Sequence, residues 1–244
     1  LFAPEHDTPL LATLRRHGGS TCGGRDGRLL LSLDGTEHDL GAIADMPLAL
    51  GGAATFNVEN LAAAALAAAA MGWPLDEVRE VLARFGADPA DNPGRLERHA
   101  WRGATVLVDY AHNPDGLAQL LAVAQALRGR GGGRLRLLLG QAGNRDDAAL
   151  AELARVAADA RPDEVVIKEL TTMLRGRALR EVPERLRQGL LAAGLPAARV
   201  HDGGDEQAAA TALLQAAQPG DVLVLPLHAP AVRDGVVAQL RQGG

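Results

Sequence analysis

The stretch that decides the fold is "TVLVDYAHNPDG", which runs from Thr105 to Gly116. Its first four residues are an apolar, β-forming run, and a helical pattern over 116–127 begins soon afterwards. Pro114 restrains the residue before it to extended geometry, and Asp115 is a suitable N-cap for the next helix. The stretch therefore predicts a strand, a short polar turn and a helix.

The same strand–helix pattern recurs four more times toward the C-terminus. We expect strands at 105–108, 135–139, 164–168, 199–201 and 222–225, and helices near 116–127, 147–160, 182–193, 205–217 and 231–240. Five consecutive units predict a Rossmann-like α/β domain, with a mostly parallel sheet covered by helices. A hairpin turning at Arg102-Gly103 adds an antiparallel strand at its start. "RGRGGG" (128–133) precedes a strand and opens no helix, so we interpret it as a flexible connection and not as a phosphate loop.

The N-terminal third has a different organisation. A short helix over 8–17 is followed by small β-pieces, with a hairpin turn at Asp34-Gly35. An alanine-rich helix over 56–71 ends at Gly72, and a second helix begins near Leu75. The cluster "ADPADNPG" (87–94) predicts a domain boundary. We therefore expect one domain over 1–88, a linker over 89–95 and a second domain over 96–244.

Composition excludes several classes of function. The net charge is -5 and basic residues are scattered, which argues against a nucleic-acid-binding face. The longest apolar stretch, 61–75, is interrupted by glycine and proline and is too short for a membrane span. Cys22 is the only cysteine, so we expect a reducing cytoplasm, and no signal peptide is visible. The 7 histidines lack zinc-ligand spacing, so no metal site is expected within the chain.

The turn from Asp109 to Asp115 is the candidate site. In such sheets, ligands bind beyond the carboxyl ends of the strands. Asp109 can accept hydrogen bonds from sugar hydroxyls, and His112 and Asn113 can donate to phosphate oxygens. The alternative is a capped turn whose polar side chains satisfy local backbone groups. The residues alone leave both interpretations open.

"VDYAHNPDG" resembles the signature that opens the C-terminal domain of the Mur ligase superfamily, which includes peptidoglycan Mur ligases, folylpolyglutamate synthases and cyanophycin synthetases. Three further stretches resemble the family's motifs in the same order: "FNVENLAAAALAAAAMG", "DNPGRLE" and "LGQAGNRDD". Within the superfamily the chain most resembles the Mur-ligase-like half of the cyanophycin synthetase branch, through "GGAATFNVENLAAA", "FGADPADNPGR", "IKE…LRGR" and "EVPERLRQGLLAAGL". The resemblance implies that 1–88 is the last part of the central ATP-binding domain and 96–244 the C-terminal domain.

The family's chemistry implies an ATP-dependent amide ligase. Such enzymes phosphorylate a carboxylate, and an amine then attacks the acyl phosphate. In the cyanophycin branch, an amino acid such as arginine is added to aspartate side chains of a poly-aspartate acceptor. ATP and Mg²⁺ are the implied cofactors. No G-x-x-x-x-G-K-[ST] loop is present and residue 1 is Leu, so we expect the phosphate loop and magnesium ligands upstream and the fragment alone to be inactive. The alternatives are another Mur-type ligase, for peptidoglycan or folylpolyglutamate, and a non-catalytic module that binds a nucleotide or a partner chain.

The resemblance also implies roles for individual residues. Asn60, with Asn57 beside it, would face the adenine, and Arg95 would reach the nucleotide phosphate or ribose. Asp109 would hold the ribose, and His112 would lie near the phosphates and act in catalysis, with Asn113 as a supporting donor. Tyr110 would pack either over the nucleotide or beneath the loop. The candidates for binding the amine substrate are Asn144, Arg145, Asp146, Arg175 and Arg177.

The sequence departs from the cyanophycin pattern where acidic residues are expected. Leu170, Thr171 and Thr172 follow "IKE", and Leu227 and His228 follow the last predicted strand. Asn144 also replaces the family's aspartate before an arginine. The amine substrate, arginine or another, is therefore left open. A homo-oligomer is also left open, since the alanine-rich helix could pack in a dimer or against its own domain.

Overall fold

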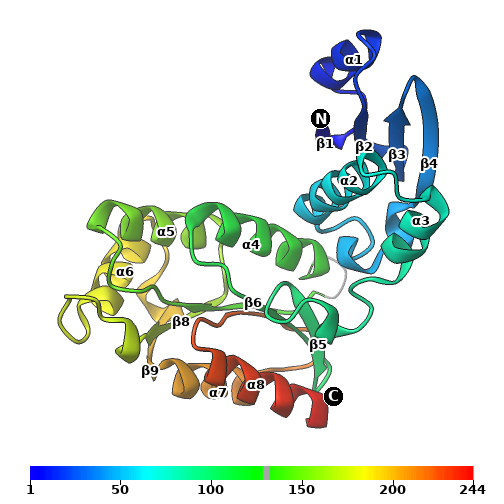
Figure 1. The fold of residues 1–244 in the computed structure, drawn as a ribbon. Helices are drawn as coiled ribbons and strands as arrows, with labels where there is room; N and C mark the ends of the chain where they lie inside the picture. The colour runs from blue at the N-terminus through cyan, green and yellow to red at the C-terminus, as the bar shows by residue number, and fades with distance from the viewer. Residues whose placement is uncertain (129–131, 244) are drawn as a thin grey trace. The chain divides into compact units, whose positions relative to one another are not determined.

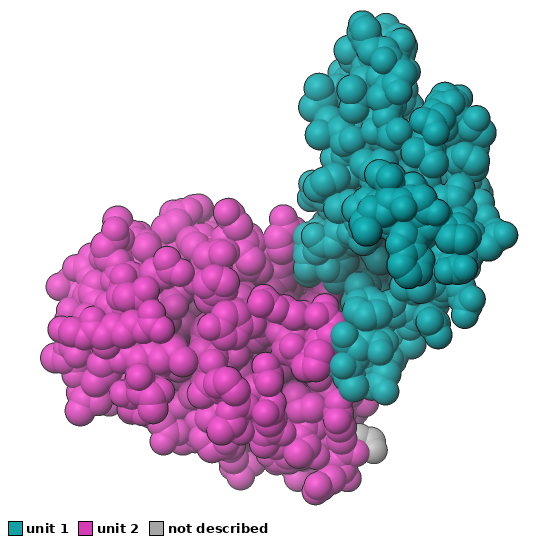
Figure 2. Space-filling view, viewed as in Figure 1, with its two compact units in different colours: residues 1–91 teal, residues 92–244 magenta. Residues whose placement is uncertain are grey.

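The computed structural model describes residues 1–128 and 132–243 (Figure 1). The chain divides into two compact units, residues 1–91 and 92–244 (Figure 2). The division falls inside the range 89–95, where the sequence favours a linker.

The first unit holds a four-stranded sheet in the order β1-β2-β3-β4. Strand β1 (Phe2–Glu5) is parallel to β2 (Thr21–Arg25), and β3 (Arg28–Leu33) and β4 (Thr36–Ala42) continue the sheet in antiparallel fashion. Asp34 and Gly35 both have positive φ, at 49° and 78°, as the predicted hairpin turn requires. The helices are α1 (Pro9–Arg16), α2 (Thr55–Ala70) and α3 (Leu75–Arg84), with 3₁₀ turns at Ile43–Asp45, Pro47–Ala49 and Pro89–Asp91.

Helix α2 packs on this sheet through small side chains. The buried apolar residues of the helix share one core cluster with Cys22, Leu29 and Leu31 of the strands. Alanine is the best helix former, and its small side chain allows close approach to the strands. Gly72, with φ of 83°, follows the helix, which confirms the predicted end.

The second unit confirms the predicted Rossmann-like fold. Its six-stranded sheet has the order β5-β6-β10-β7-β8-β9. All neighbours pair in parallel except β5 with β6. The strands are β5 (Glu97–Trp101), β6 (Ala104–Asp109), β7 (Leu135–Leu139), β8 (Glu164–Glu169), β9 (Val200–Asp205) and β10 (Val222–Pro226). Arg102 and Gly103, both with positive φ, form the predicted turn between β5 and β6.

Helices cover both faces of this sheet. α4 (Pro114–Arg128), α5 (Asp147–Asp159) and α6 (Glu181–Ala192) lie on one face, and α7 (Glu206–Ala216) and α8 (Pro230–Gly243) lie on the other (Figure 1). Short 3₁₀ turns lie at Thr171–Met173 and Ala197–Arg199. Of the predicted connection "RGRGGG", residues 129–131 lie outside the described residues. No helix in the described ranges is long and apolar enough to cross a membrane.

Candidate nucleotide site

The turn from Asp109 to Asp115 lies where the direction of the strand–helix connections reverses. Asp109 ends β6 and pairs in register with Pro226, the last residue of the neighbouring strand β10. The chain leaves β6 for α4 on one face and leaves β10 for α8 on the opposite face (Figure 1). A crevice between adjacent strands whose connections diverge is the usual ligand position in open α/β sheets.

Asp109 joins the turn to the preceding linker. Its Oδ1 accepts a hydrogen bond from the Ala111 backbone N–H at 2.6 Å, and its Oδ2 accepts one from the Leu96 N–H at 2.7 Å. Burial raises the pKa of Asp109, although these two N–H donors and the charge of Arg95 oppose the rise. The carboxylate thus makes the local backbone contacts that the capped-turn interpretation anticipates.

The linker presents Arg95 by means of two unusual backbone conformations. Gly94 and Leu96, on either side of Arg95, have φ of 72° and 50°. The buried carboxylate of Glu97 accepts a hydrogen bond from the Gly94 N–H. A Cβ at Gly94 would lie 2.9 Å from the Cδ atom of Arg233, so glycine fits this position for two reasons. The bent linker leaves the Arg95 side chain exposed.

Tyr110 is the centre of an aromatic cluster. The Arg95 guanidinium carbon lies over its ring, 5.3 Å from the centroid. The rings of His112 and His228 lie 5.2 and 5.4 Å away, centroid to centroid. The tyrosine therefore connects the linker, the turn and the end of β10, and the flat guanidinium is held by a cation–π contact.

His112 and Asn113 differ in what their side chains do. The Nδ1 of His112 lies 3.3 Å from the Tyr110 carbonyl oxygen, which can only accept. Within the described chain, no hydrogen bond to its Nε2 is found. The Oδ1 of Asn113 accepts a hydrogen bond from the Gly116 N–H at 2.7 Å and caps α4. The predicted cap at Asp115 was therefore wrong: with Pro114 as the first helical residue, Asp115 lies inside the first turn.

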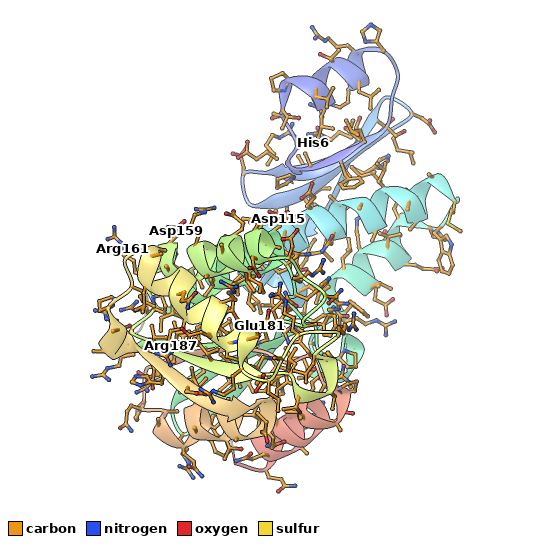
Figure 3. All side chains as sticks on the ribbon, turned by 90° about the vertical axis from the view of Figure 1, so that its left-hand side faces the viewer. His6, Asp115, Asp159, Arg161, Glu181 and Arg187 are labelled. Carbon is orange, nitrogen blue, oxygen red and sulfur yellow. The ribbon has the colours of Figure 1, made fainter. Side chains whose placement is uncertain are left out.

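Arg177, a candidate for the amine site, holds the loop between β7 and α5. Its Nε and Nη2 donate to the carbonyls of Gly143 and Arg145 at 3.2 and 2.6 Å. Its Nη1 lies 2.8 Å from Asp147 and 2.7 Å from Glu181, which Figure 3 labels at the start of α6. The guanidinium is thus engaged by protein groups on several sides.

The other amine-site candidates divide into two kinds. Asp146 caps α5, because its Oδ1 accepts a hydrogen bond from the Ala149 N–H at 2.8 Å. Asn144 and Arg175 are exposed, and Arg145 is half-buried. Arg175 has φ of 47°, so it occupies a left-handed turn just before Arg177.

In the first unit, Asn57 has a structural role. Its Nδ2 donates to the Leu48 carbonyl at 2.9 Å, and its Oδ1 accepts a hydrogen bond from Asn60 Nδ2 at 3.3 Å. Asn60 itself is exposed on α2. Of the two, Asn60 is therefore the residue open to a ligand.

The positions that depart from the cyanophycin pattern face different surroundings. Leu170 and Leu227 are buried, at 5% and 1% exposure, and Leu227 belongs to the core of the second unit. Thr171 and Thr172 are exposed. The two leucines therefore contribute to packing and do not line the surface of a substrate site.

Sequence reasoning missed a buried polar cluster beneath the turn. Lys168 at the end of β8 donates to Glu206, to the Pro226 carbonyl and, at 3.0 Å, to the Nδ1 of His228. These residues are separated by 38 and 22 positions, so no local motif reveals them. The signal was in the topology, because all three residues belong to the carboxyl edge of the sheet. Lys168 lies in the apolar run "VVIKE", Glu206 opens a helix and His228 follows the last strand.

Comparison with known proteins identifies the family. A profile of the family described as "Mur ligase, glutamate ligase domain" matches residues 94–226, more than half of the chain. The chain belongs to the Mur ligase family. This confirms the resemblance of the turn and linker motifs, both of which lie in the matched range apart from the first residues of the linker.

Curated relatives in two branches of the Mur ligase family are similar to the chain. The cyanophycin synthetase of Nostoc sp. is 31% identical over 226 residues, which cover 92% of this chain and 24% of that protein. The UDP-N-acetylmuramoyl-L-alanyl-D-glutamate–2,6-diaminopimelate ligase of Thermosynechococcus vestitus is 34% identical over 175 residues, covering 70% and 32%. The chain thus spans about a quarter to a third of these relatives.

A solved structure has a similar fold. Escherichia coli FolC in complex with DHPP and ADP superposes with a TM-score of 0.62 at 20% sequence identity, covering 99% of this chain and 53% of that one. In the part of the chain that the structure describes, no group of three or more His, Cys, Asp or Glu side chains could hold a metal ion.

Proposed function

We propose that this chain is the nucleotide- and amine-binding part of an ATP-dependent amide ligase that acts through an acyl phosphate. The observation that carries the proposal is the exposed Arg95 guanidinium, held over Tyr110 beside His112 at the carboxyl edge of β6. Residues 1–88 would be the end of the central ATP-binding domain, 89–95 the linker and 96–244 the C-terminal domain.

The residues of the turn fit an anionic nucleotide. Arg95 has no carboxylate within ion-pair distance among the described residues, so it is available to a phosphate or ribose. The Nδ1 of His112 is oriented by the Tyr110 carbonyl, so its Nε2 would be the ring atom that contacts a phosphate oxygen. ATP, when bound, supplies the phosphoryl group that activates the carboxylate. The metal ion proposed to accompany ATP is Mg²⁺.

The site residues are proposed to act by binding and orientation. Arg95 and His112 would counter negative charge on the phosphates, and Asp109 would keep linker and turn in one arrangement. Asn60 would contact the adenine from α2. Asn144, Arg145 and Arg175 would face the amine substrate, while Arg177 and Asp146 would hold the loop that carries the first two. Such positioning brings two substrates into line, the main requirement of acyl transfer from a phosphate.

The substrate proposed is an amino acid, arginine or a variant, added to aspartate side chains of a poly-aspartate acceptor in the cytoplasm. The match to a cyanophycin synthetase over 92% of the chain supports this branch. The 34% identity to a diaminopimelate-adding ligase supports, as a second candidate, another Mur-type ligase. The buried Leu170 and Leu227 leave the choice of amine to the exposed loops.

The test is phosphate release by the full-length gene product with ATP, Mg²⁺ and a poly-aspartate primer, each amino acid being added singly. His112→Ala is the matched control. Release with arginine that the variant loses would support the cyanophycin-type ligase. Release with another amine only would retain the ligase and replace the substrate. Absence of release with every amine and primer tested would overturn the proposal in favour of a non-catalytic binding module.

A further inference from the structure

The buried cluster of Lys168, Glu206 and His228, here called the Lys–Glu–His cluster, is hydrogen-bonded to the backbone of the candidate turn. Lys168 is fully buried, and Glu206 and His228 are 4% and 5% exposed. All three N–H groups of the ammonium are used, by Glu206 Oε1, the Pro226 carbonyl and His228 Nδ1. Gly140 makes room for the lysine, since a Cβ there would lie 2.4 Å from Lys168 Cγ.

Glu206 fixes the segment that follows β10. Its Oε1 accepts a hydrogen bond from the His228 N–H, and its Oε2 accepts one from the Ala229 N–H, each at 2.8 Å. One carboxylate therefore holds the lysine and two consecutive peptide groups. This places the His228 side chain at a defined point below the turn.

The hydrogen-bond pattern determines the tautomer of His228. An ammonium group can only donate, so the Nδ1 of His228 accepts from Lys168. The proton of the neutral ring is then on Nε2, which lies 3.2 Å from the Ala111 carbonyl oxygen and donates to it. Burial and the nearby Lys168 charge both lower the pKa of His228, in agreement with a neutral ring.

The acceptor of that bond is the central peptide of the candidate site. The Ala111 N–H is held by Asp109 and the Ala111 carbonyl by His228. The next carbonyl, that of His112, accepts a hydrogen bond from Gln141 Nε2 at 2.7 Å. The His228 ring also meets Tyr110 edge-on at 5.4 Å. The peptide groups on both sides of the His112 Cα are thus fixed from below the turn.

We propose that His228 is a positioning residue: it transmits the geometry of the Lys–Glu–His cluster to Ala111 and Tyr110, and so holds His112 and the ring beneath Arg95 in their nucleotide-facing arrangement. The kinetic consequence of this inference rests on the proposed ligase function. A buried ion pair adds little stability compared with apolar residues of the same size. The hydrogen bond from His228 to the Ala111 carbonyl adds a second role, because it fixes one arrangement of the turn.

Two substitutions at His228 separate its hydrogen bond from Lys168, which serves folding, from its hydrogen bond to the Ala111 carbonyl, which serves positioning. In His228→Asn, the amide oxygen takes the place of Nδ1 and keeps an acceptor for Lys168, but the side chain is too short to reach Ala111. In His228→Gln, the amide nitrogen takes the place of Nε2 and keeps the donor to Ala111, but Lys168 loses its acceptor. A positioning role predicts a displaced turn in the first variant and a less stable protein with the turn in place in the second.

Tyr110 is the only tyrosine of the chain, so ring-labelled tyrosine gives a single NMR signal from the turn. We expect this signal to shift in the 244-residue His228→Asn chain and to remain near its wild-type position in His228→Gln, while thermal unfolding shows the larger loss in His228→Gln. An unshifted signal in His228→Asn, or shifts that follow the loss of stability in both variants, would overturn the proposal.

The kinetic arm uses the full-length gene product. We expect kcat/KM for ATP to fall about tenfold or more in His228→Asn and to stay within about threefold in His228→Gln, because small misplacements of a site residue slow catalysis strongly. The reverse order would contradict the positioning role. If the gene product has no ligase activity, the proposed function fails, whereas the Tyr110 signal still decides whether His228 positions the turn.

Discussion

Replacing Glu206 by glutamine is the sharpest test of the buried cluster's energetics. Burial alone would raise the pKa of Glu206, but the charge and hydrogen bond of Lys168 and the hydrogen bond from the His228 backbone N–H outweigh it and lower the pKa to about 2. Relative to an ordinary 4.5, the carboxylate adds about 3 kcal/mol of stability at neutral pH, at about 1.4 kcal/mol per pKa unit. Burial lowers the pKa of Lys168 to about 8 even though Glu206 opposes the shift, so without this carboxylate the buried ammonium would lose either its counter-ion or its proton. Breaking such a pair costs about 3–5 kcal/mol, in the same range.

We therefore expect Glu206→Gln to lower the free energy of unfolding by about 3 kcal/mol at pH 7, or Tm by roughly 6–12 °C for a unit of this size. Urea unfolding followed by the fluorescence of the buried Trp101 would measure it, in a Trp73→Phe background that removes the signal of the first unit. The exposed Glu152→Gln is the control and should leave the midpoint unchanged.

The pH dependence has a defined sign. Because the pKa of Glu206 is lowered on folding, its contribution is complete above about pH 4.5 and is lost as the pH falls toward 2. The difference between wild type and Glu206→Gln should therefore shrink to roughly half or less at pH 3. A difference below about 1 kcal/mol at pH 7, or one that is constant from pH 7 to pH 3, would refute the reasoning.

Three further predictions concern other residues. Arg95→Ala should lower kcat/KM for ATP by about tenfold or more in the full-length gene product without changing Tm, because among the described residues its exposed guanidinium forms a cation–π contact with Tyr110 and no ion pair; an unchanged kcat/KM would show that Arg95 does not bind the nucleotide. Asn113→Ala should lower stability by about 1 kcal/mol in thermal unfolding through loss of the α4 cap, and Asp115→Ala should not; equal effects would contradict the assignment. Cys22 is fully buried and burial raises its pKa to about 12, so a thiol reagent at pH 8 should label it only at the rate of unfolding. Immediate labelling would show that the core around Cys22 opens without unfolding of the chain.

Most of the fold could be predicted because the signals that determine it are local. Continuous apolar runs such as Val222–Leu225 are typical of strands buried on both faces, and this run became the central strand β10. Turn residues at Asp34-Gly35 and Arg102-Gly103 marked two of the three hairpins correctly, and the third, between β2 and β3, turns at Asp26-Gly27. The capping error at α4 arose from choosing the acid inside the first turn over the asparagine before Pro114, which has the better position.

The candidate site was less predictable because its pairings span the sequence. The motif located the turn, but the contact of Arg95 with Tyr110 depends on left-handed backbone at Leu96, a conformation that leucine rarely adopts. The engagement of Arg177 by Gly143 and Arg145 likewise depends on two loops meeting beyond the sheet. No spacing rule yields such contacts, since they are set by tertiary packing.

The strand order of the second unit has a consequence for how the chain is made. β10 lies between β6 and β7, yet the ribosome synthesises it after every other strand of that sheet. Until residues 222–226 emerge, β6 has only β5 as a partner, and β7, β8 and β9 form a separate fragment with an open apolar edge. After β9 is complete at residue 205, the nascent chain therefore carries two unjoined half-sheets, and the sheet closes only when the central strand at 222–226 arrives between them.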